Sequence, residues 1–351
     1  MIFRFYREPL KYTYISISKS ILYPFVGILF VVVLRWGVLG ATLANLIPSV
    51  ITLAIGYFYF VKKKYIRQFS WHWAKKMLKF GFPLIFFSVL SWVNSVSDRF
   101  FLLYYQDLSQ IGLYSIGNTF SQPIALINGA LQMSVFVFIF SLYGEEKDNE
   151  KPKTKDFLTK IWYMYLAITV SSACLVSIFS YDLVFYITTP EYIGGILAIP
   201  FLLFSQILYM GTELTGNGMT LKEQSKPYVW IMLIAAVANI GLNFYFIPKF
   251  GYVGAAITTI ISNLINFFIS YFWSQRLFYI KRSLLKPSIY FLIVLSIAIF
   301  FPFYELKSGE HISYLIKIIV FVSALALPFI LGIVNYKLII NLINHINQRI
   351  R

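Results

Sequence analysis

The stretch Ser95–Leu103, SVSDRFFLL, places an aspartate and an arginine side by side within a long apolar run. The surrounding segment, residues 80–105, is long and apolar enough to cross a bilayer as a helix. A charged side chain at the middle of a bilayer costs roughly 2.5–3.5 kcal/mol. Asp98 and Arg99 are therefore expected to face a polar interior, where they could handle a charged ligand.

Polar and small side chains recur at helical spacing on this segment and on the next one. The first stripe consists of Ser88, Ser91, Asn94, Ser95 and Asp98. The second stripe consists of Ser115, Asn118, Gln122, Ala125, Gly129 and Gln132. Such stripes are expected to face the protein interior or a water-filled cavity. Because amide groups both donate and accept hydrogen bonds, two facing amide stripes suit a hydroxyl-rich sugar.

The composition excludes a water-soluble domain. The 351 residues are 59% hydrophobic and 13% charged, whereas a soluble domain is about 45–50% apolar and about 25% charged. The single cysteine, Cys174, rules out a disulfide within the chain. The formal charge of +16 does not indicate a nucleic-acid-binding face, since the basic residues form short clusters between apolar segments.

The sequence predicts an all-α integral membrane protein with about ten transmembrane helices. The predicted spans are residues 14–34, 38–61, 79–105, 110–143, 157–180, 194–217, 227–247, 251–274, 284–303 and 312–340. If the N-terminus is cytoplasmic, all but five of the 30 Lys and Arg residues lie on the cytoplasmic side. The exceptions are Arg35, Arg99, Lys249, Lys307 and Lys317. Both termini are therefore predicted to be cytoplasmic.

Two connecting regions carry further expectations. The polar stretch Gly144–Asp156 predicts a flexible cytoplasmic linker, and residues 181–193 are expected to form a short outer loop. Lys317, five residues into its predicted helix, is expected to extend its ammonium group outward to the membrane surface.

An internal repeat predicts the domain organisation. Gly37–Ile47, GVLGATLANLI, resembles Gly251–Ile261, GYVGAAITTII, and both helices run from outside to inside, as in transporters with two parallel halves. The repeat predicts that residues 1–61 are the last two helices of an incomplete N-terminal lobe. Residues 62–276 then form a complete six-helix C-terminal lobe, and residues 277–351 an additional helix pair. The alternative is chance similarity, because small residues pack helices in general.

Three stretches together resemble one family. Leu78–Gly117 contains Gly-x-Pro, Asp-Arg and Gly-x-Tyr motifs, and Ala238–Thr259 contains Asn-x-x-x-Asn followed by Ile-Pro-x-Phe-Gly-x-x-Gly-Ala-Ala. The third stretch is the shorter echo at Gly37–Ala44. The chain resembles the polysaccharide-transport family of the MOP superfamily, the Wzx-type flippases of O-antigen or capsule repeat units. Lipid II flippases and MATE exporters are its relatives.

This resemblance implies a fourteen-helix fold of two six-helix lobes and a final pair, of which this chain matches the last ten helices. The chain therefore looks N-terminally truncated. The implied function is a flippase that moves a lipid-diphosphate-linked oligosaccharide across the bacterial cytoplasmic membrane by alternating access. The implied partners are an undecaprenyl-diphosphate-type glycan lipid, membrane lipids and glycan polymerase machinery, with no nucleic acid and no cofactor.

Such a cargo suggests roles for the polar residues. Arg99 is expected to bind the diphosphate or sugar acids, because a guanidinium group binds phosphate oxygens bidentately, and Asp98 is expected to orient or gate Arg99. The other expected substrate contacts are Asn94, Asn118, Gln122 and Gln132. The alternatives for Asp98 and Arg99 are a structural ion pair, or an Arg99 side chain that simply reaches the outer surface.

Glu213 has two possible roles. It could bind a coupling proton or cation and act as a gate, or it could pair with a lysine at the cytoplasmic mouth. Asn239 and Asn243, four residues apart, are expected to form hydrogen bonds between helices rather than to contact cargo. The three histidines are scattered, so the sequence predicts no metal site.

Two other classes of function fit the sequence less well. A MATE-like cation-coupled exporter of small molecules would need a lipophilic cavity with little cationic character. A membrane glycosyltransferase or polymerase would need paired catalytic acids or a large outer loop. The outer loops carry mostly isolated acids: Asp107, Asp182, Glu191, Glu305 and Glu310. The protein is therefore not expected to be an enzyme, and no catalytic residue is assigned.

Overall fold

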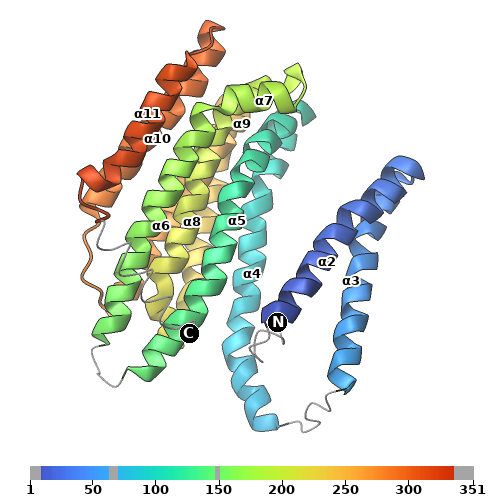
Figure 1. Cartoon of the computed structure of the whole chain (residues 1–351), viewed down its shortest axis with the longest axis vertical. Coiled ribbons are helices and arrows are strands. Elements are labelled where there is room, and N and C mark those ends of the chain that lie inside the picture. The colour runs from blue at the N-terminus through green and yellow to red at the C-terminus, as the bar shows by residue number, and fades with distance from the viewer. Residues whose placement is uncertain (1–8, 63–69, 147–150, 336–351) are drawn as a thin grey trace. The chain divides into compact units, whose positions relative to one another are not determined.

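The computed structural model describes residues 9–62, 70–146 and 151–335, and every regular element in these ranges is a helix (Figure 1). Within the same ranges, seven helices are long and apolar enough to cross a membrane. Two shorter apolar helices, Ile17–Val33 and Tyr314–Ile330, accompany them. The predicted all-α membrane architecture is confirmed. The end of the last predicted span lies outside the described residues, as do the terminal basic residues Arg4, Arg7, Lys337, Arg349 and Arg351.

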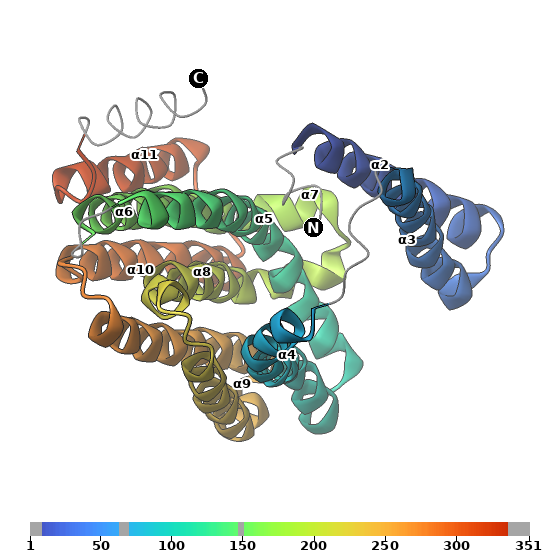
Figure 2. The same ribbon diagram turned by 90° about the horizontal axis from the view of Figure 1, so that it is seen from below.

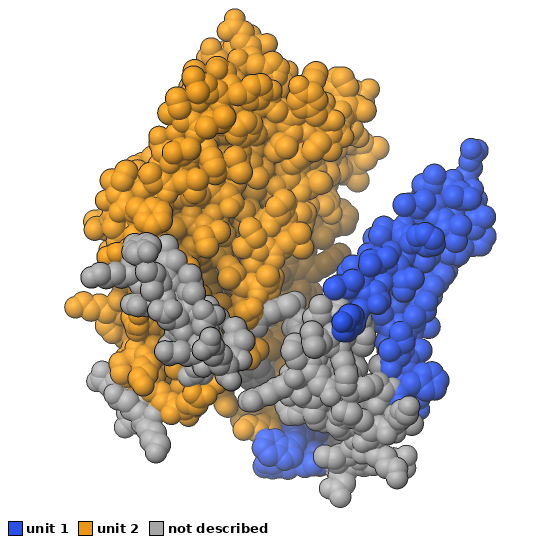
Figure 3. Space-filling model, in the orientation of Figure 1, with its two compact units in different colours: residues 1–74 blue, residues 75–351 orange. Residues whose placement is uncertain are grey.

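The chain forms two compact units, residues 1–74 and 75–351 (Figure 3). In the first unit, α2 (Pro9–Gly27) continues into a π-helical turn, η1 (Ile28–Val33), and the chain then reverses into α3 (Gly37–Lys62). This helical hairpin corresponds to the first two predicted spans. The domain borders predicted at residues 61 and 276 remain predictions.

The second unit is a helical bundle that begins within α4. Its elements are α4 (Trp71–Tyr105), α5 (Leu108–Glu145), α6 (Pro152–Ile178), α7 (Ser180–Ile187), η2 (Pro190–Ala198), α8 (Ile199–Leu221), α9 (Lys226–Leu277), α10 (Leu285–Ser308) and α11 (Tyr314–Ile330). Helix α8 lies at the centre, against α5, α6 and α9, and α10 and α11 both pack on α6 (Figure 2). The prediction of a short loop at residues 181–193 is wrong, because that stretch is mostly helical: it contains most of α7 and the start of η2.

Helix α9 contains two of the predicted spans, separated by a sharp break at Gly251. The backbone of Gly251 has φ 54° and ψ −134°, a conformation that side-chain-bearing residues rarely adopt. Three residues later, a Cβ atom on Gly254 would collide with the carbonyl oxygen of Phe246. The first glycine therefore allows the chain to turn, and the second allows the arms 226–250 and 251–277 to approach closely.

The same corner occurs in the first unit, at the other copy of the repeated motif. Gly37 has φ 53°, and a Cβ atom on Gly40 would lie 2.9 Å from the carbonyl oxygen of Phe30. The two Gly-x-x-Gly-Ala stretches thus share a positive φ at the first glycine and a close backbone contact at the second, which supports the repeat over chance similarity.

Replacement of Gly254 with alanine is expected to lower the free energy of unfolding by about 2–3 kcal/mol, because the added methyl group meets backbone that cannot rotate away. Equilibrium unfolding in mixed detergent micelles measures this change. Gly241→Ala is the matched control in the same helix, since nothing lies within 4 Å of its added Cβ. Equal losses from both substitutions would show that the close approach at Gly254 does not matter.

The predicted linker at residues 144–156 is anchored at both described ends. The Glu146 carboxylate accepts hydrogen bonds from the Lys153 amide (2.8 Å) and from the amide (3.1 Å) and hydroxyl (2.8 Å) of Thr154. Burial raises the pKa of Glu146, but these hydrogen bonds and the charge of Lys151 outweigh burial and bring the pKa below its ordinary value. Glu146 thus joins the end of α5 to the start of α6.

The contribution of Glu146 to stability should depend on pH. Because its pKa is lowered in the folded protein, the stabilisation is present above the unfolded-state pKa of about 4.3 and is lost as the pH falls through the folded-state value. The difference in apparent Tm between the wild type and Glu146→Gln should therefore be largest near pH 7 and disappear well below pH 4. A difference that stays constant across this range would exclude a role for the carboxylate charge.

Candidate functional site

Asp98 is buried in α4 and is the centre of a polar network that joins three helices. Its Oδ2 accepts hydrogen bonds from the Tyr114 hydroxyl of α5 and the Thr259 hydroxyl of α9, each at 2.7 Å. Its Oδ1 accepts a hydrogen bond from the Asn243 amide of α9 at 2.8 Å. Only 1% of the Asp98 surface is exposed, so these three donors replace the water that a free carboxylate would bind.

The network continues along α9 through both of its arms. Asn243 also donates to the Oδ1 atom of Asn239 (3.1 Å), which accepts a second hydrogen bond from Ser97 (2.7 Å). On the other arm, the Thr258 hydroxyl donates to the Oδ1 atom of Asn243 at 2.5 Å. The close approach that the Gly-x-x-Gly corner permits brings these two arms within hydrogen-bonding distance. The prediction that Asn239 and Asn243 bond between helices is confirmed.

Arg99, one residue beyond Asp98, is exposed and has no ion pair within the described ranges. The carboxylate of Asp98 is already occupied by three neutral donors, and the guanidinium group of Arg99 is not one of them. The two neighbours therefore have different surroundings: Asp98 is bonded to side chains of two other helices, whereas Arg99 is exposed. The structure does not show the direct contact in which Asp98 would orient Arg99.

The amide residues of the two predicted stripes are only partly brought together. Asn94 is half-buried, and its Oδ1 atom has no hydrogen-bond partner in the described structure. Asn118 is half-buried, whereas Gln122 and Gln132 are exposed. The α5 stripe reaches α8, because the Gln132 amide lies 3.4 Å from the Glu213 carboxylate.

Glu213 is half-buried on α8, and its carboxylate accepts this hydrogen bond from the Gln132 amide. No lysine pairs with it among the residues the structure describes, so the predicted partner at the cytoplasmic mouth is not seen. A neighbouring polar contact that the sequence did not indicate lies in the same region. Asn128 donates to the Gln206 carbonyl (2.9 Å) and accepts from the Tyr165 hydroxyl (3.0 Å), linking α5, α6 and α8.

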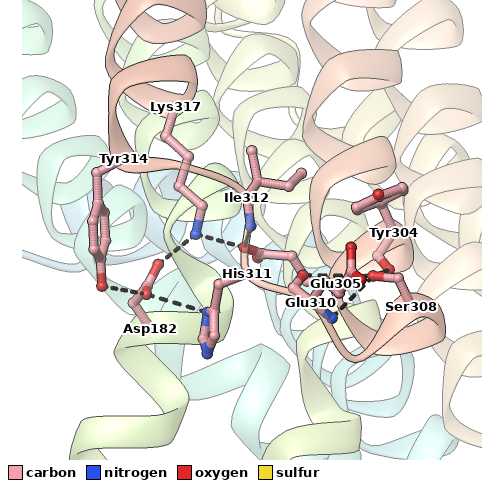
Figure 4. Close-up of polar contacts among 9 residues, drawn as sticks. All are labelled: Asp182, Tyr304, Glu305, Ser308, Glu310, His311, Ile312, Tyr314 and Lys317. Atoms are coloured by element: carbon pink, nitrogen blue, oxygen red, sulfur yellow. Dashed lines mark hydrogen bonds and ion pairs between the residues drawn. The ribbon is translucent and has the colours of Figure 1, made fainter.

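Lys317 is the clearest correction to the sequence-based predictions. Instead of reaching outward, it is completely buried, with its Nζ atom 2.5 Å from Asp182 and 2.8 Å from Glu305 (Figure 4). The two acids that looked isolated in the sequence thus share one ammonium group. In the described parts of the chain, no three or more His, Cys, Asp or Glu side chains form a metal-binding group.

Comparisons with known proteins agree with this geometry. Residues 10–153 match the family described as polysaccharide biosynthesis protein. Over 245 residues, the chain is 23% identical to the uncharacterized membrane protein MJ1068 of Methanocaldococcus jannaschii, covering 66% of this chain and 48% of that protein. The chain therefore spans about half the length of this relative.

The structure is similar to the lipid II flippase MurJ in its inward closed conformation. The TM-score is 0.61 and the sequence identity 19%, over 92% of this chain and 68% of the MurJ chain. The chain therefore shares the fold of this MurJ structure. The family match over residues 10–153 and the shared fold both agree with the resemblance predicted from the Asp-Arg and Gly-x-x-Gly-Ala-Ala stretches.

The second unit also carries an apolar groove that sequence reasoning missed. A cavity of about 370 Å³ lies among α6, α8, α9 and α10, and Trp162, Ile207, Phe267 and Phe291 are among its lining residues. Trp162 stacks on Phe267, with ring centroids 5.6 Å apart. No periodicity within one helix indicates such a groove, because its walls come from four different elements.

Proposed function

We propose that this protein acts as a flippase, or as part of one. The flippase would move a lipid-diphosphate-linked oligosaccharide across the bacterial cytoplasmic membrane by alternating access. The observation that carries this proposal is Arg99, an exposed arginine on a membrane-spanning helix that has no ion pair in the described ranges. An unpaired cation at this place is costly unless a ligand or water compensates it. A diphosphate is a suitable ligand, because the planar guanidinium group binds two phosphate oxygens at once.

The amide residues suit the sugar part of the same cargo. Asn94, with its unpartnered carbonyl oxygen, and Asn118, Gln122 and Gln132 offer donors and acceptors along α4 and α5. Glu213, within reach of Gln132, is proposed as the coupling or gating carboxylate. Asp98 acts differently, since its network positions α4, α5 and α9 around the path.

The apolar groove suits the remaining part of the cargo. Its walls lie almost entirely on helices long and apolar enough to span the membrane, and they are built from aliphatic and aromatic side chains. An isoprenoid tail of the undecaprenyl type is the occupant we propose. In this proposal the groove binds the isoprenoid tail, the amide residues bind the sugar, and Arg99 binds the diphosphate of a single lipid-linked glycan.

The domain roles follow the repeat. We propose that residues 1–61 correspond to the last two helices of one lobe, residues 62–276 to a second lobe, and residues 277–351 to an additional pair. The shared Gly37 and Gly251 corners support this correspondence. Both termini are proposed to be cytoplasmic, and glycan polymerase machinery is the proposed downstream partner.

A binding experiment on the purified full chain tests the cargo. Native mass spectrometry in detergent should detect retention of an undecaprenyl-diphosphate disaccharide and much weaker retention of the same disaccharide on undecaprenol without phosphates. Proteoliposomes containing the protein should then make the fluorescent diphosphate lipid accessible to an impermeant quencher faster than empty vesicles do. Equal retention of both lipids would reject the diphosphate as the recognised group, and absence of both retention and transport would reject the proposal.

A further inference from the structure

The buried ammonium group of Lys317 lies in a pocket made by residues from several elements. Its Nζ atom is 2.5 Å from Asp182 Oδ2 on α7 and 2.8 Å from Glu305 Oε1 at the end of α10 (Figure 4). Lys317 and Glu305 are 0% and 1% exposed, and Asp182 is 8% exposed. A lysine that only reached for the membrane surface would keep its charged end in water.

Two aromatic rings complete the surroundings of the ammonium group. The Nζ atom is 5.4 Å from the ring centroid of Phe179 and 5.8 Å from that of Tyr314, within the range of a cation–π interaction. The rings stack with an angle of 11° between their planes. The Tyr314 hydroxyl donates to Asp182 Oδ1 at 3.0 Å, which holds that carboxylate in place.

The charges around Lys317 favour a cation at this position. Two carboxylates face one ammonium group, and Glu305 Oε2 is buried without a hydrogen-bond partner in the described structure. Glu305 Oε1 also accepts a hydrogen bond from the Ile312 amide (3.1 Å), which holds the loop between α10 and α11. His311, 3.9 Å from Asp182, is half-exposed and lies at the edge of the cluster. Removing the ammonium group would leave two buried carboxylates without a cation, which is strongly unfavourable.

We propose that Asp182, Glu305, Phe179 and Tyr314 form a binding site for a primary ammonium ion, and that the chain fills this site with its own Lys317 side chain. The paired carboxylates supply the charge and the aromatic faces select an organic cation. Because Lys317 belongs to α11 while Asp182 and Glu305 belong to α7 and α10, the bound ammonium group fastens α11 to the rest of the unit. This inference does not depend on the cargo of the transporter.

Chemical rescue of a truncated lysine tests the proposal. Lys317→Ala removes three carbon atoms and the nitrogen, which together equal n-propylammonium. The apparent Tm of the full-length variant in detergent should fall by about 5 °C or more. Addition of millimolar n-propylammonium should restore part of this loss in a saturable manner, whereas n-propanol, the neutral analogue, should not. Equal recovery with n-propanol, or no recovery with n-propylammonium, would overturn the proposal.

Control variants separate the site from general effects. Lys307→Ala removes an exposed lysine whose Nζ lies 5.8 Å from the Phe303 ring centroid, and n-propylammonium should leave its Tm unchanged. The double variant Asp182→Asn with Lys317→Ala should show much less rescue.

If Lys317→Ala does not accumulate as folded protein, the triple variant Asp182→Asn, Glu305→Gln and Lys317→Met decides the question. It removes all three charges at nearly constant volume, so it should fold and be insensitive to n-propylammonium. Failure of this variant to fold, or a response to the amine, would overturn the proposal.

Discussion

Replacing Asp98 with alanine is expected to lower the free energy of unfolding by about 3 kcal/mol and to abolish transport. The substitution leaves the Tyr114 and Thr259 hydroxyls and the Asn243 amide without their shared acceptor, and each buried unsatisfied donor costs about 1–3 kcal/mol. The estimate lies well below the full sum because each donor has another acceptor within reach. The Tyr114 hydroxyl lies 3.3 Å from that of Thr259, Thr259 also bonds to the Ala255 carbonyl, and Asn243 also bonds to Asn239. Unfolding in mixed micelles and proteoliposome transport measure the two effects.

Two further substitutions separate the contribution of the hydrogen-bond network to stability from the contribution of the Asp98 charge to transport. Ser97→Ala removes one hydrogen bond from the same network and leaves Asn239 Oδ1 bonded to Asn243, so it should cost at most about 1 kcal/mol. Asp98→Asn keeps the shape and one acceptor oxygen but removes the charge. If Asp98→Asn is nearly as stable as the wild type yet inactive, the charge is needed for transport. If Asp98→Ala is as stable as Ser97→Ala, the network does not hold the helices together.

Replacing Arg99 with alanine is expected to reduce transport of the diphosphate-linked glycan by about 10–100-fold, the loss of one charge-assisted contact of about 1.5–3 kcal/mol. Because Arg99 is exposed and has no ion pair in the described ranges, the apparent Tm should change little. Arg99→Lys should recover only part of the activity, since an ammonium group cannot form the bidentate pair.

Lys249 provides the matched control for Arg99. It is another exposed cation, two residues before the break at Gly251 in α9, and its Nζ atom lies 3.6 Å from the ring centroid of Tyr245. Lys249→Ala should leave transport unchanged if the phosphate role is specific to Arg99. Full transport by Arg99→Ala would reject that role, and equal losses from both variants would indicate a general effect of positive charge.

The helices themselves were largely predictable, because the bilayer imposes long apolar runs that are visible residue by residue. The paired glycines at positions 37 and 251 even located the two corners, since only glycine adopts their backbone conformation without strain. The short helices α7 and η2 were missed. They are too short and too mixed in composition to produce a membrane-span signal, and their packing on the unit decides their conformation.

The site was predictable only in part, because its contacts join residues far apart in the chain. The sequence identified Asp98 as unusual, but its partners are 16, 145 and 161 residues away. Tyr114 and Thr259 belonged to the motifs that carried the family resemblance, which was the available signal for them. Lys317 and Glu305 gave no such signal, since a buried ion pair and a surface lysine look the same until the helices are packed together.

The two corner hairpins share a backbone turn but differ in what lies between their arms. If the carbonyls of Phe30 and Phe246 occupy equivalent places beside Gly40 and Gly254, then Gly27 and Ala44 correspond to Asn243 and Thr258. In the first hairpin these two positions carry small apolar residues that lie close together. A Cβ atom added to Gly27 would lie 3.7 Å from the Cβ atom of Ala44.

In the second hairpin the same two positions share a hydrogen bond of 2.5 Å. The bend is thus common to both hairpins, while the polar contact between the arms belongs to one of them. The turn itself does not require that contact, so the two features can vary independently.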